Sequence, residues 1–134
     1  MAEKALVTGS SSGIGRGAAL ALARDGYDVA IHCGKSVAAA EEVAHAIEAM
    51  GRRSIVLVAD VKDLGQLNAM FDRLFTEFGP LDVLVNNAGI TGYKPFLEVT
   101  DEFFHQILCT NLRSHYFATQ RAARNMIEHR IPGR

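Results

Sequence analysis

The sequence predicts an α/β fold built on a doubly wound parallel sheet, and three observations lead to this prediction. Four short apolar segments alternate with longer segments of helical periodicity. A glycine-rich turn follows the first apolar segment, and polar residues follow the third and the fourth. This succession favours right-handed crossovers, helices on both faces of the sheet, and a ligand crevice at the carboxyl ends of the strands.

The strands are expected at residues 5–7, 28–33, 54–59 and 82–85. Each segment is apolar almost throughout, whereas a half-buried strand would alternate apolar and polar residues. We therefore expect every strand to be buried on both faces.

Helical periodicity is clearest between the second and the fourth strand. Ala40, Val43, Ala44 and Ile47 fall on one face of a helix that Gly51 ends. The next helix is expected to begin at Asp63, which with Gln66 has the spacing of a capping pair, and to end before Gly79-Pro80. Its core side is expected to carry Leu67, Met70, Phe71, Leu74, Phe75 and Phe78.

Beyond the fourth strand, the sequence predicts two more helical segments. Thr100 is placed to cap one of them, with Asp101 and Glu102 in its first turn. A long helical region is expected from about residue 111 to residue 130.

Length and composition predict one globular domain over residues 1–134, with 49% hydrophobic residues and a net charge of −1. Such a balanced charge argues against nucleic-acid and anionic-membrane binding. No apolar run reaches the ~18 residues of a membrane span, and no signal segment precedes the first strand, so a cytoplasmic location is expected. Cys33 and Cys109 form no Cys-x-x-Cys pair, which fits a reducing compartment.

The glycine turn has the chemistry of a phosphate-binding loop. Glycines here allow a tight strand-to-helix turn whose N–H groups face a pyrophosphate at the helix N-terminus. Arg16-Gly17 follows in place of Lys-Ser/Thr, so the turn is not a P-loop. An ordinary structural turn remains the alternative. The candidate cofactor-binding residues in this segment are Gly9, Ser11, Ser12, Gly13, Ile14, Gly15 and Arg16.

Two further turns lie at strand ends where ligands are expected. Asp60 could accept a hydrogen bond from an adenine amino group while the N–H of Val61 contacts a ring nitrogen. In the segment 86–89, the side-chain amides of Asn86 and Asn87 can tie the turn to neighbouring strands, and Ala88-Gly89 leaves room for a nucleotide. A helix-leading Asp and a plain Asn-rich turn are the alternatives.

With these turns and Thr110-Asn111-Leu112 in this order, the chain resembles the short-chain dehydrogenase/reductase family from about residue 4 to residue 134. The resemblance implies a Rossmann-type sheet truncated after the fourth strand and the following helices. It implies that the glycine turn holds the pyrophosphate, that Asp60 meets the adenine, and that Asn87, Ala88 and Gly89 line the adenosine side. It also implies a catalytic role for Asn111, which would help to hold a water in a proton relay.

The family's other catalytic residues, a Ser and a Tyr-x-x-x-Lys pair, have no counterpart here. Tyr27, Tyr93 and Tyr116 are followed four residues later by Ile31, Leu97 and Gln120, so none has the lysine that would lower its pKa. Residues 131–134 look like the loop that feeds the family's fifth strand. We therefore expect about half of a family domain to be absent and the 134 residues alone to be inactive.

The cofactor expected is NADP, with NAD possible. An NAD-binding turn usually carries an acidic residue about 20 residues after its glycines, which would repel a 2′-phosphate. Residues 31–36 contain no acid, whereas Lys35 and Arg16 could face a phosphate. Lys35 could also be simply solvated.

No metal site is expected, because the histidines show no ligand spacing. We expect each of the five histidines to be a surface or partly buried helix residue, namely His32, His45, His105, His115 and His129.

The resemblance implies an oxidoreductase that transfers hydride between NAD(P) and a small carbonyl or alcohol substrate. The alternative is a non-catalytic nucleotide-binding or interaction protein; a receiver-type signalling domain is disfavoured, because the first strand does not end in acidic residues. We expect a homo-oligomer, or pairing with a complementary fragment, through apolar residues of the last helix, namely Leu112, Tyr116, Ala123, Met126 and Ile127.

Overall fold

The computed structural model describes residues 1–134, and its elements follow the predicted alternation of strands and helices. The strands are β1 (Lys4–Val7), β2 (Asp28–Cys33), β3 (Ser54–Val58) and β4 (Val83–Val85). They form one parallel sheet in the order β3-β2-β1-β4, with β1 paired to both β2 and β4.

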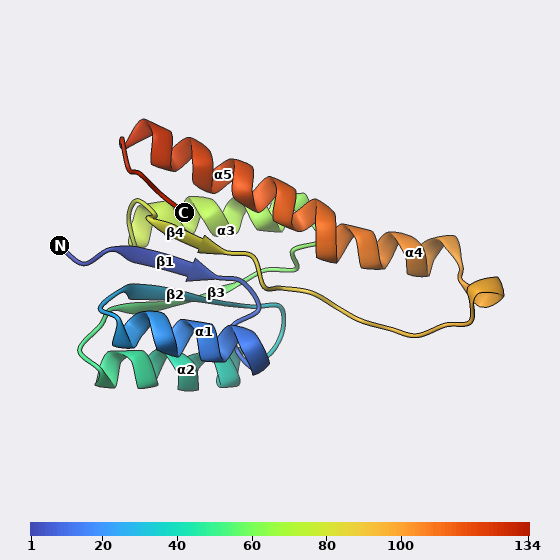
Figure 1. Cartoon of the computed structure of the whole chain (residues 1–134), viewed down its shortest axis with the longest axis horizontal. Helices are drawn as coiled ribbons and strands as arrows, with labels where there is room; N and C mark the ends of the chain where they lie inside the picture. Colours follow the sequence, from blue (N-terminus) through green and yellow to red (C-terminus); the bar gives the residue numbers. More distant parts are fainter.

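Helices cover both faces of the sheet, as Figure 1 shows. One face carries α1 (Gly13–Arg24) and α2 (Val37–Ala49), and the other carries α3 (Leu64–Glu77) and α5 (Ser114–Glu128). Consecutive residues of a strand point to opposite faces of the sheet and pack into different cores. Val7 packs in the core on the α1–α2 side, and Leu6 packs in the core on the α3–α5 side. The predicted doubly wound sheet is therefore confirmed.

Burial on both faces holds only for the centre of the sheet. Nearly all residues of β1 and β2 are buried, but the side chain of Val58 in β3 is 50% exposed, and Leu84 and Val85 in β4 are half-buried. The expectation of four fully buried strands is wrong, because β3 and β4 lie at the edges of the sheet.

The α3 helix forms as its sequence pattern predicts. The carboxylate of Asp63 caps it by accepting hydrogen bonds from the backbone N–H groups of Gly65 (2.8 Å) and Gln66 (3.2 Å). Its core side is buried against the sheet through Leu67, Met70, Phe71, Leu74 and Phe78, with Phe75 packed beside them.

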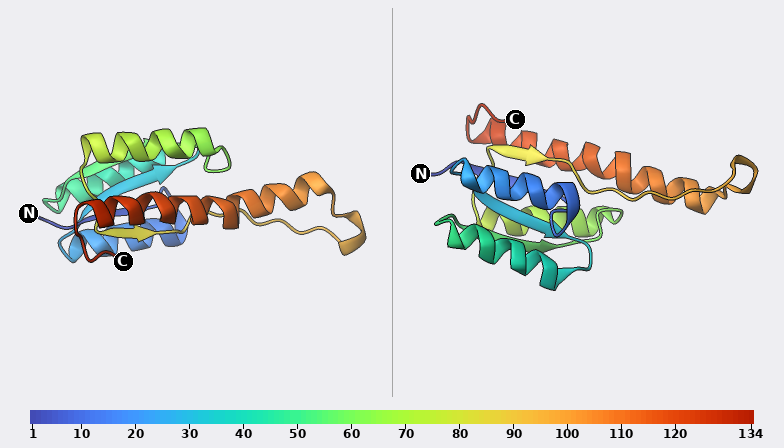
Figure 2. Two further views of the ribbon diagram at one scale, coloured as in Figure 1. Left: turned by 90° about the horizontal axis from the view of Figure 1, so that it is seen from above. Right: turned by 60° about the horizontal axis from the view of Figure 1, so that its bottom comes forward.

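A continuous helical rod projects beyond the sheet in Figures 1 and 2. It consists of α4 (Asp101–Leu108), a π-helical turn (Cys109–Arg113) and α5. The hydroxyl of Thr100 caps α4 by accepting from the Phe103 N–H at 3.2 Å, as expected. The segment from β4 to α4 is exposed from Gly89 on and contains a short 3₁₀ helix (Phe96–Glu98). It runs out to the tip of the rod, where α4 begins and leads back toward the sheet (Figure 2).

After α5 the chain returns to the sheet. The backbone of Arg134 donates to the carbonyl of Asp82 at 3.0 Å and accepts from the N–H of Leu84 at 2.9 Å. These bonds on either side of Val83 follow the pattern of a parallel ladder, so Arg134 lies along the outer edge of β4.

Candidate functional site

A cleft of about 370 Å³ lies at the carboxyl ends of the strands, where the fold predicts ligands. The turn after every strand contributes to it, and the rod closes one side with Gln106 and Thr110. Of the candidate residues, the structure brings together Gly9, Lys35, Asp60, Val61, Ala88 and Gly89.

The N-terminus of α1 presents a row of unsatisfied donors. The backbone N–H groups of residues 11–15 donate to no acceptor within the chain, and Ser12 at the N-cap makes no side-chain capping bond. Free amides at a helix N-terminus carry partial positive charge and are suited to an anion. These residues and Arg16 do not line the cleft; Ile14 and Arg16 are exposed.

Gly9 and Gly15 allow the turn to approach the segment after β4. Gly9 has a φ of +63°, and a Cβ there would lie 2.9 Å from the Cα of Ala88. A Cβ on Gly15 would overlap the side-chain amide of Asn87 and the carbonyl of Gly9. These two positions therefore have no room for a side chain.

Asn87 joins the glycine turn to the end of β4. Its Nδ2 donates to the carbonyls of Thr8 (2.9 Å) and Gly9 (3.0 Å), and its backbone N–H donates to the Thr8 hydroxyl at 2.9 Å. Asn86 instead donates from Nδ2 to the hydroxyl of Thr119 in α5 at 2.9 Å. Asn87 thus ties this turn to the end of the neighbouring strand β1, as the sequence predicted, whereas Asn86 bonds to a helix and not to a strand.

Asp60 is exposed at the edge of the cleft, and Lys62 lies next to it. The Oδ1 of Asp60 accepts from the Lys62 backbone N–H at 3.0 Å, and Oδ2 lies 3.7 Å from the Lys62 ammonium. Lys62 also lines the cleft but was not a candidate, because a lysine four residues after the end of a strand cannot be distinguished by sequence from a solvated one.

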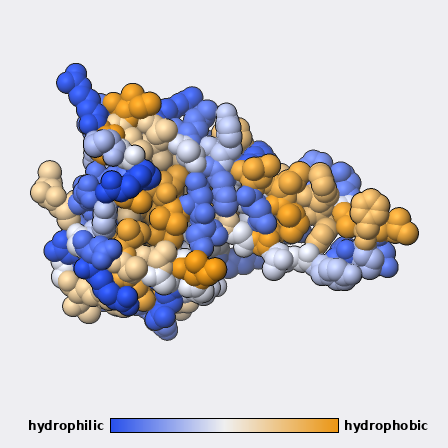
Figure 3. Space-filling model, in the orientation of Figure 1, coloured by the Kyte–Doolittle hydropathy of each residue, from blue (hydrophilic) through white to orange (hydrophobic).

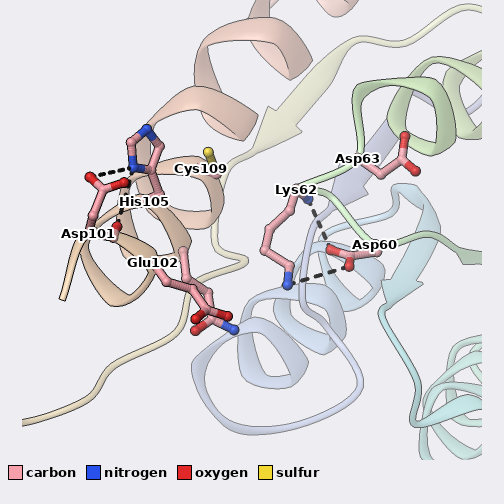
Figure 4. Close-up of a pocket in the computed structure, with 8 residues that line it drawn as sticks. Asp60, Lys62, Asp63, Asp101, Glu102, His105 and Cys109 are labelled. Atoms are coloured by element: carbon pink, nitrogen blue, oxygen red, sulfur yellow. Dashed lines mark hydrogen bonds and ion pairs between the residues drawn. The ribbon is translucent and has the colours of Figure 1, made fainter.

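A larger hollow of about 770 Å³ lies between the Asp60 turn and α4. Figure 4 shows carboxylates on both of its walls, with Lys62 paired to Asp60 and His105 paired to Asp101. Asp63 and Glu102 add two further carboxylates. This excess of negative charge disfavours phosphate, so the cleft and not the hollow suits a dinucleotide.

His32 lies in an environment that the sequence did not predict. It was expected to be a surface or partly buried helix residue, but it lies in β2 and is only 2% exposed. Its Nδ1 accepts from the Gly9 N–H and its Nε2 meets the Ala59 carbonyl, both at 3.0 Å. Burial lowers the pKa of His32, and the hydrogen bond with Ala59 partly opposes that shift. Its position inside an apolar strand segment was the sequence feature from which this burial could have been predicted.

The other histidines lie in helices or directly after one. His45 and His105 are exposed, and His129 follows α5. His115 in α5 is half-buried, and its Nε2 lies 2.6 Å from the carbonyl of Ala88.

Asn111 lies in the π-helical turn and holds the segment after β4. Its Oδ1 accepts from the Ile90 N–H at 2.8 Å, and its Nδ2 donates to the Ile90 carbonyl at 2.7 Å. One N–H and one lone pair of the amide remain for a water or a ligand. A π-turn inside an α-helix is often found at functional sites.

No group of His, Cys, Asp and Glu side chains is arranged to share a metal ion. None of the helices combines the length and the apolarity needed to span a bilayer.

Comparison with known proteins gives consistent matches along the chain. A family model described as short chain dehydrogenase matches residues 3–134. The 3-oxoacyl-(acyl-carrier-protein) reductase FabG of Staphylococcus aureus is 40% identical over 97% of this chain and 53% of its own length. L-2,3-butanediol dehydrogenase of Corynebacterium glutamicum is 38% identical over 100% of this chain and 52% of its own length.

A solved short chain dehydrogenase from Burkholderia cenocepacia, in complex with NADP, superposes with a TM-score of 0.88. It is 44% identical, and the match covers 91% of this chain and 50% of that one. The chain therefore spans about half the length of the curated relatives it matches.

Proposed function

The chain belongs to the short-chain dehydrogenase family, and from this we propose that it is the dinucleotide-binding part of an NAD(P)-dependent oxidoreductase. The observation that carries the proposal is the cleft at the carboxyl ends of the strands, where the Asp60 turn and the turn tied by Asn87 meet. The free amides at the N-terminus of α1 follow Gly9 of the cleft lining in the chain but lie outside that lining. The reaction proposed is reduction of a carbonyl, or oxidation of an alcohol, on a small molecule.

In this proposal the phosphates and the adenosine bind at separate turns. The free N–H groups of residues 11–15 hold the pyrophosphate, helped by Arg16. The carboxylate of Asp60 and the N–H of Val61 meet the adenine. Asn87 acts indirectly by holding Gly9 in place, while Ala88 and Gly89 lie against the nucleotide.

We propose NADP as the preferred cofactor within the family's NAD(P) range. Lys35 is exposed, lines the cleft and forms no ion pair, so its ammonium is free for a 2′-phosphate. The solved relative from Burkholderia cenocepacia, which holds NADP, supports this assignment.

The bound cofactor would supply the hydride. Of the chain's own residues, Asn111 positions the segment after β4 through Ile90 and keeps one N–H and one lone pair for a water of the proton relay. No tyrosine of the chain has a lysine four residues later to lower its pKa. We propose that these 134 residues bind the cofactor without turning over substrate.

The rod suggests a partner. Leu108, Leu112 and Tyr116 are exposed along it, and Leu112 and Tyr116 line two adjoining shallow hollows. Figure 3 shows apolar side chains gathered on this part of the molecule. We propose that a second copy of the chain covers this surface. Of the other residues expected there, Ile127 is exposed, whereas Ala123 and Met126 are half-buried and Met126 packs on the core.

Dinucleotide binding by the Gly15→Ala variant tests the proposed site. The new methyl group would displace Asn87 and the carbonyl of Gly9, so we expect the dissociation constant for NADPH to rise by at least about tenfold. The measurement is titration of nicotinamide fluorescence, with thermal unfolding followed on the same samples.

Gly17→Ala is the matched control. A Cβ there meets no atom within 4 Å, and alanine favours the helix, so NADPH binding should be unchanged. Equal affinities for both folded variants, or no binding by the unmodified protein, would contradict the proposal.

A further inference from the structure

The buried ring of His32 connects two of the turns to which we assign cofactor binding. Gly9 belongs to the glycine turn, and Ala59 directly precedes Asp60. The imidazole of His32 lies between them, 3.0 Å from each partner atom, and it lines the cleft. A single side chain therefore joins the pyrophosphate side of the cleft to its adenine side.

Only one protonation state of the ring satisfies both contacts. A backbone N–H can only donate, so the Nδ1 facing Gly9 must be unprotonated. A carbonyl can only accept, so the Nε2 facing Ala59 must carry the proton. The contacts thus select the neutral Nε2–H tautomer.

A second proton on the ring would place Nδ1–H against the N–H of Gly9, two donors facing each other. No unpaired carboxylate lines the cleft to stabilise the positive charge of the protonated ring. The charged groups around the cleft are Lys35, Asp60 and Lys62, and the carboxylate of Asp60 is already engaged by Lys62. The turn after β1 and the rod add no charged side chain to the cleft lining.

The strands beneath the ring are held independently of it. The hydroxyl of Ser10 donates to the Val7 carbonyl at 2.7 Å and accepts from the backbone N–H of His32 at 3.0 Å. The N–H of Ser10 in turn donates to the His32 carbonyl at 2.9 Å. Loss of the ring contacts would therefore loosen the Gly9 N–H and the Ala59 carbonyl, while Asn87 still holds the Gly9 carbonyl and the β1–β2 pairing persists.

We propose that neutral His32 is a positioning residue that holds the glycine turn and the Asp60 turn in the arrangement that binds a dinucleotide, and that its protonation loosens both turns and weakens binding. This inference rests on the proposed function. It adds a residue and a pH dependence to the same site.

The test is the pH dependence of NADP⁺ affinity, measured by calorimetry from about pH 8 to about pH 5. If the protonated form does not bind, the dissociation constant should rise about tenfold for each pH unit below the pKa of His32. At a given pH, NADP⁺ carries the same charge in the measurement on the unmodified protein and in the measurement on each variant. The ratio of the two dissociation constants therefore isolates the effect of His32.

Two substitutions separate the two contacts. His32→Asn places an amide oxygen near Nδ1, so it should keep the Gly9 bond and lose only the Ala59 contact. It should bind NADP⁺ more weakly than the unmodified protein near pH 8, and its affinity should lack the further decrease at low pH that protonation of His32 causes. His32→Gln can reach Ala59 but leaves Gly9 without an acceptor, so it should bind more weakly at every pH. The control is His45→Asn, an exposed histidine of α2, which should keep the original pH profile.

The outcomes distinguish this inference from the proposed function. No NADP⁺ binding by the unmodified protein at about pH 8 would overturn the proposed function. If His32→Asn binds NADP⁺ and its affinity decreases at low pH as much as that of the unmodified protein, only the role of His32 would be overturned. Another group would then be responsible for the pH dependence.

A measurement on the unmodified protein without ligand decides the case if the variants fail to fold. Nitrogen chemical shifts of the imidazole should show the Nε2–H tautomer, and exchange of the Gly9 amide should accelerate as His32 becomes protonated. An Nδ1–H tautomer, or a Gly9 amide insensitive to that protonation, would overturn the inference.

Discussion

In the proposed function, Lys35 is the residue on which the choice between NADP and NAD depends. It follows β2 at the edge of the cleft, no acidic residue lies nearby in residues 31–36, and its ammonium has no ion-pair partner. A free cation at this point attracts a 2′-phosphate but contributes little to binding of a ribose hydroxyl.

We therefore expect Lys35→Ala to raise the dissociation constant for NADPH by about ten- to a hundredfold, because one charge-assisted contact is worth about 1.5–3 kcal/mol. The constant for NADH should change by less than about twofold. Fluorescence titration of both cofactors with the same protein measures this difference.

The matched control for Lys35→Ala is Arg24→Ala, which removes an exposed positive charge at the far end of α1 from the glycine turn. It should leave both constants unchanged. Equal weakening of NADPH and NADH by Lys35→Ala would assign the lysine to general attraction of the cofactor instead of the 2′-phosphate.

At the level of single residues, some members of the candidate site could be predicted from the sequence and others could not. The glycines, Asp60 and Asn87 could be chosen because each follows a strand and carries a recognisable chemistry. A role for His32 could not be predicted, because that role depends on the distance between the glycine turn and the Asp60 turn. Only the folded sheet fixes this distance. The engagement of Asp60 by Lys62 was missed for a different reason, because the sequence does not distinguish this lysine from a solvated one.

Among the elements, α3 depends on the charge of its cap. The hydrogen bonds from the Gln66 and Gly65 N–H groups hold the pKa of Asp63 below its usual range. A carboxyl group with a lowered pKa in the folded state stabilises that state above its ordinary pKa of 3.8, and the contribution is lost as the pH falls below that value.

Asp63→Asn should therefore unfold at a lower urea concentration than the unmodified protein near neutral pH, and the two midpoints should converge below about pH 3.8. The asparagine keeps an oxygen for capping, so the comparison isolates the charge. A midpoint difference that is constant over this range would show that the charge of Asp63 does not stabilise α3.

The elements differ in how well the sequence could predict them. The α3 helix was predictable because its cap, its apolar side and its terminating Gly79-Pro80 all agree. The β3 strand is as apolar as β2, yet it lies at a sheet edge, and strand order is a tertiary property that apolar content does not encode. The π-helical turn around Asn111 was not anticipated, because its residues have ordinary helical propensities.

On the scale of the whole molecule, the apolar residues divide between two places. The centre of the sheet buries its apolar residues on both faces, but the rod leaves Leu112 64% exposed and Tyr116 66% exposed. An α-helix exposed to water normally turns polar side chains outward, and α4 has no buried residue at all. Covering this surface with a second copy would bury apolar area that the isolated chain leaves in water.

Leu112→Glu tests whether the rod is that interface. In a two-fold interface the same patch contributes from both copies, so the substitution removes two buried leucines of about 1.5 kcal/mol each and adds two negative charges. We expect sedimentation to show self-association of the unmodified protein and a dissociation constant at least about a hundredfold higher for the variant. Arg124→Glu changes the charge of an exposed α5 residue and should leave the mass distribution unchanged. Identical sedimentation of the unmodified protein and Leu112→Glu would mean that the rod does not mediate association, and its apolar surface would then have to be covered by a different chain.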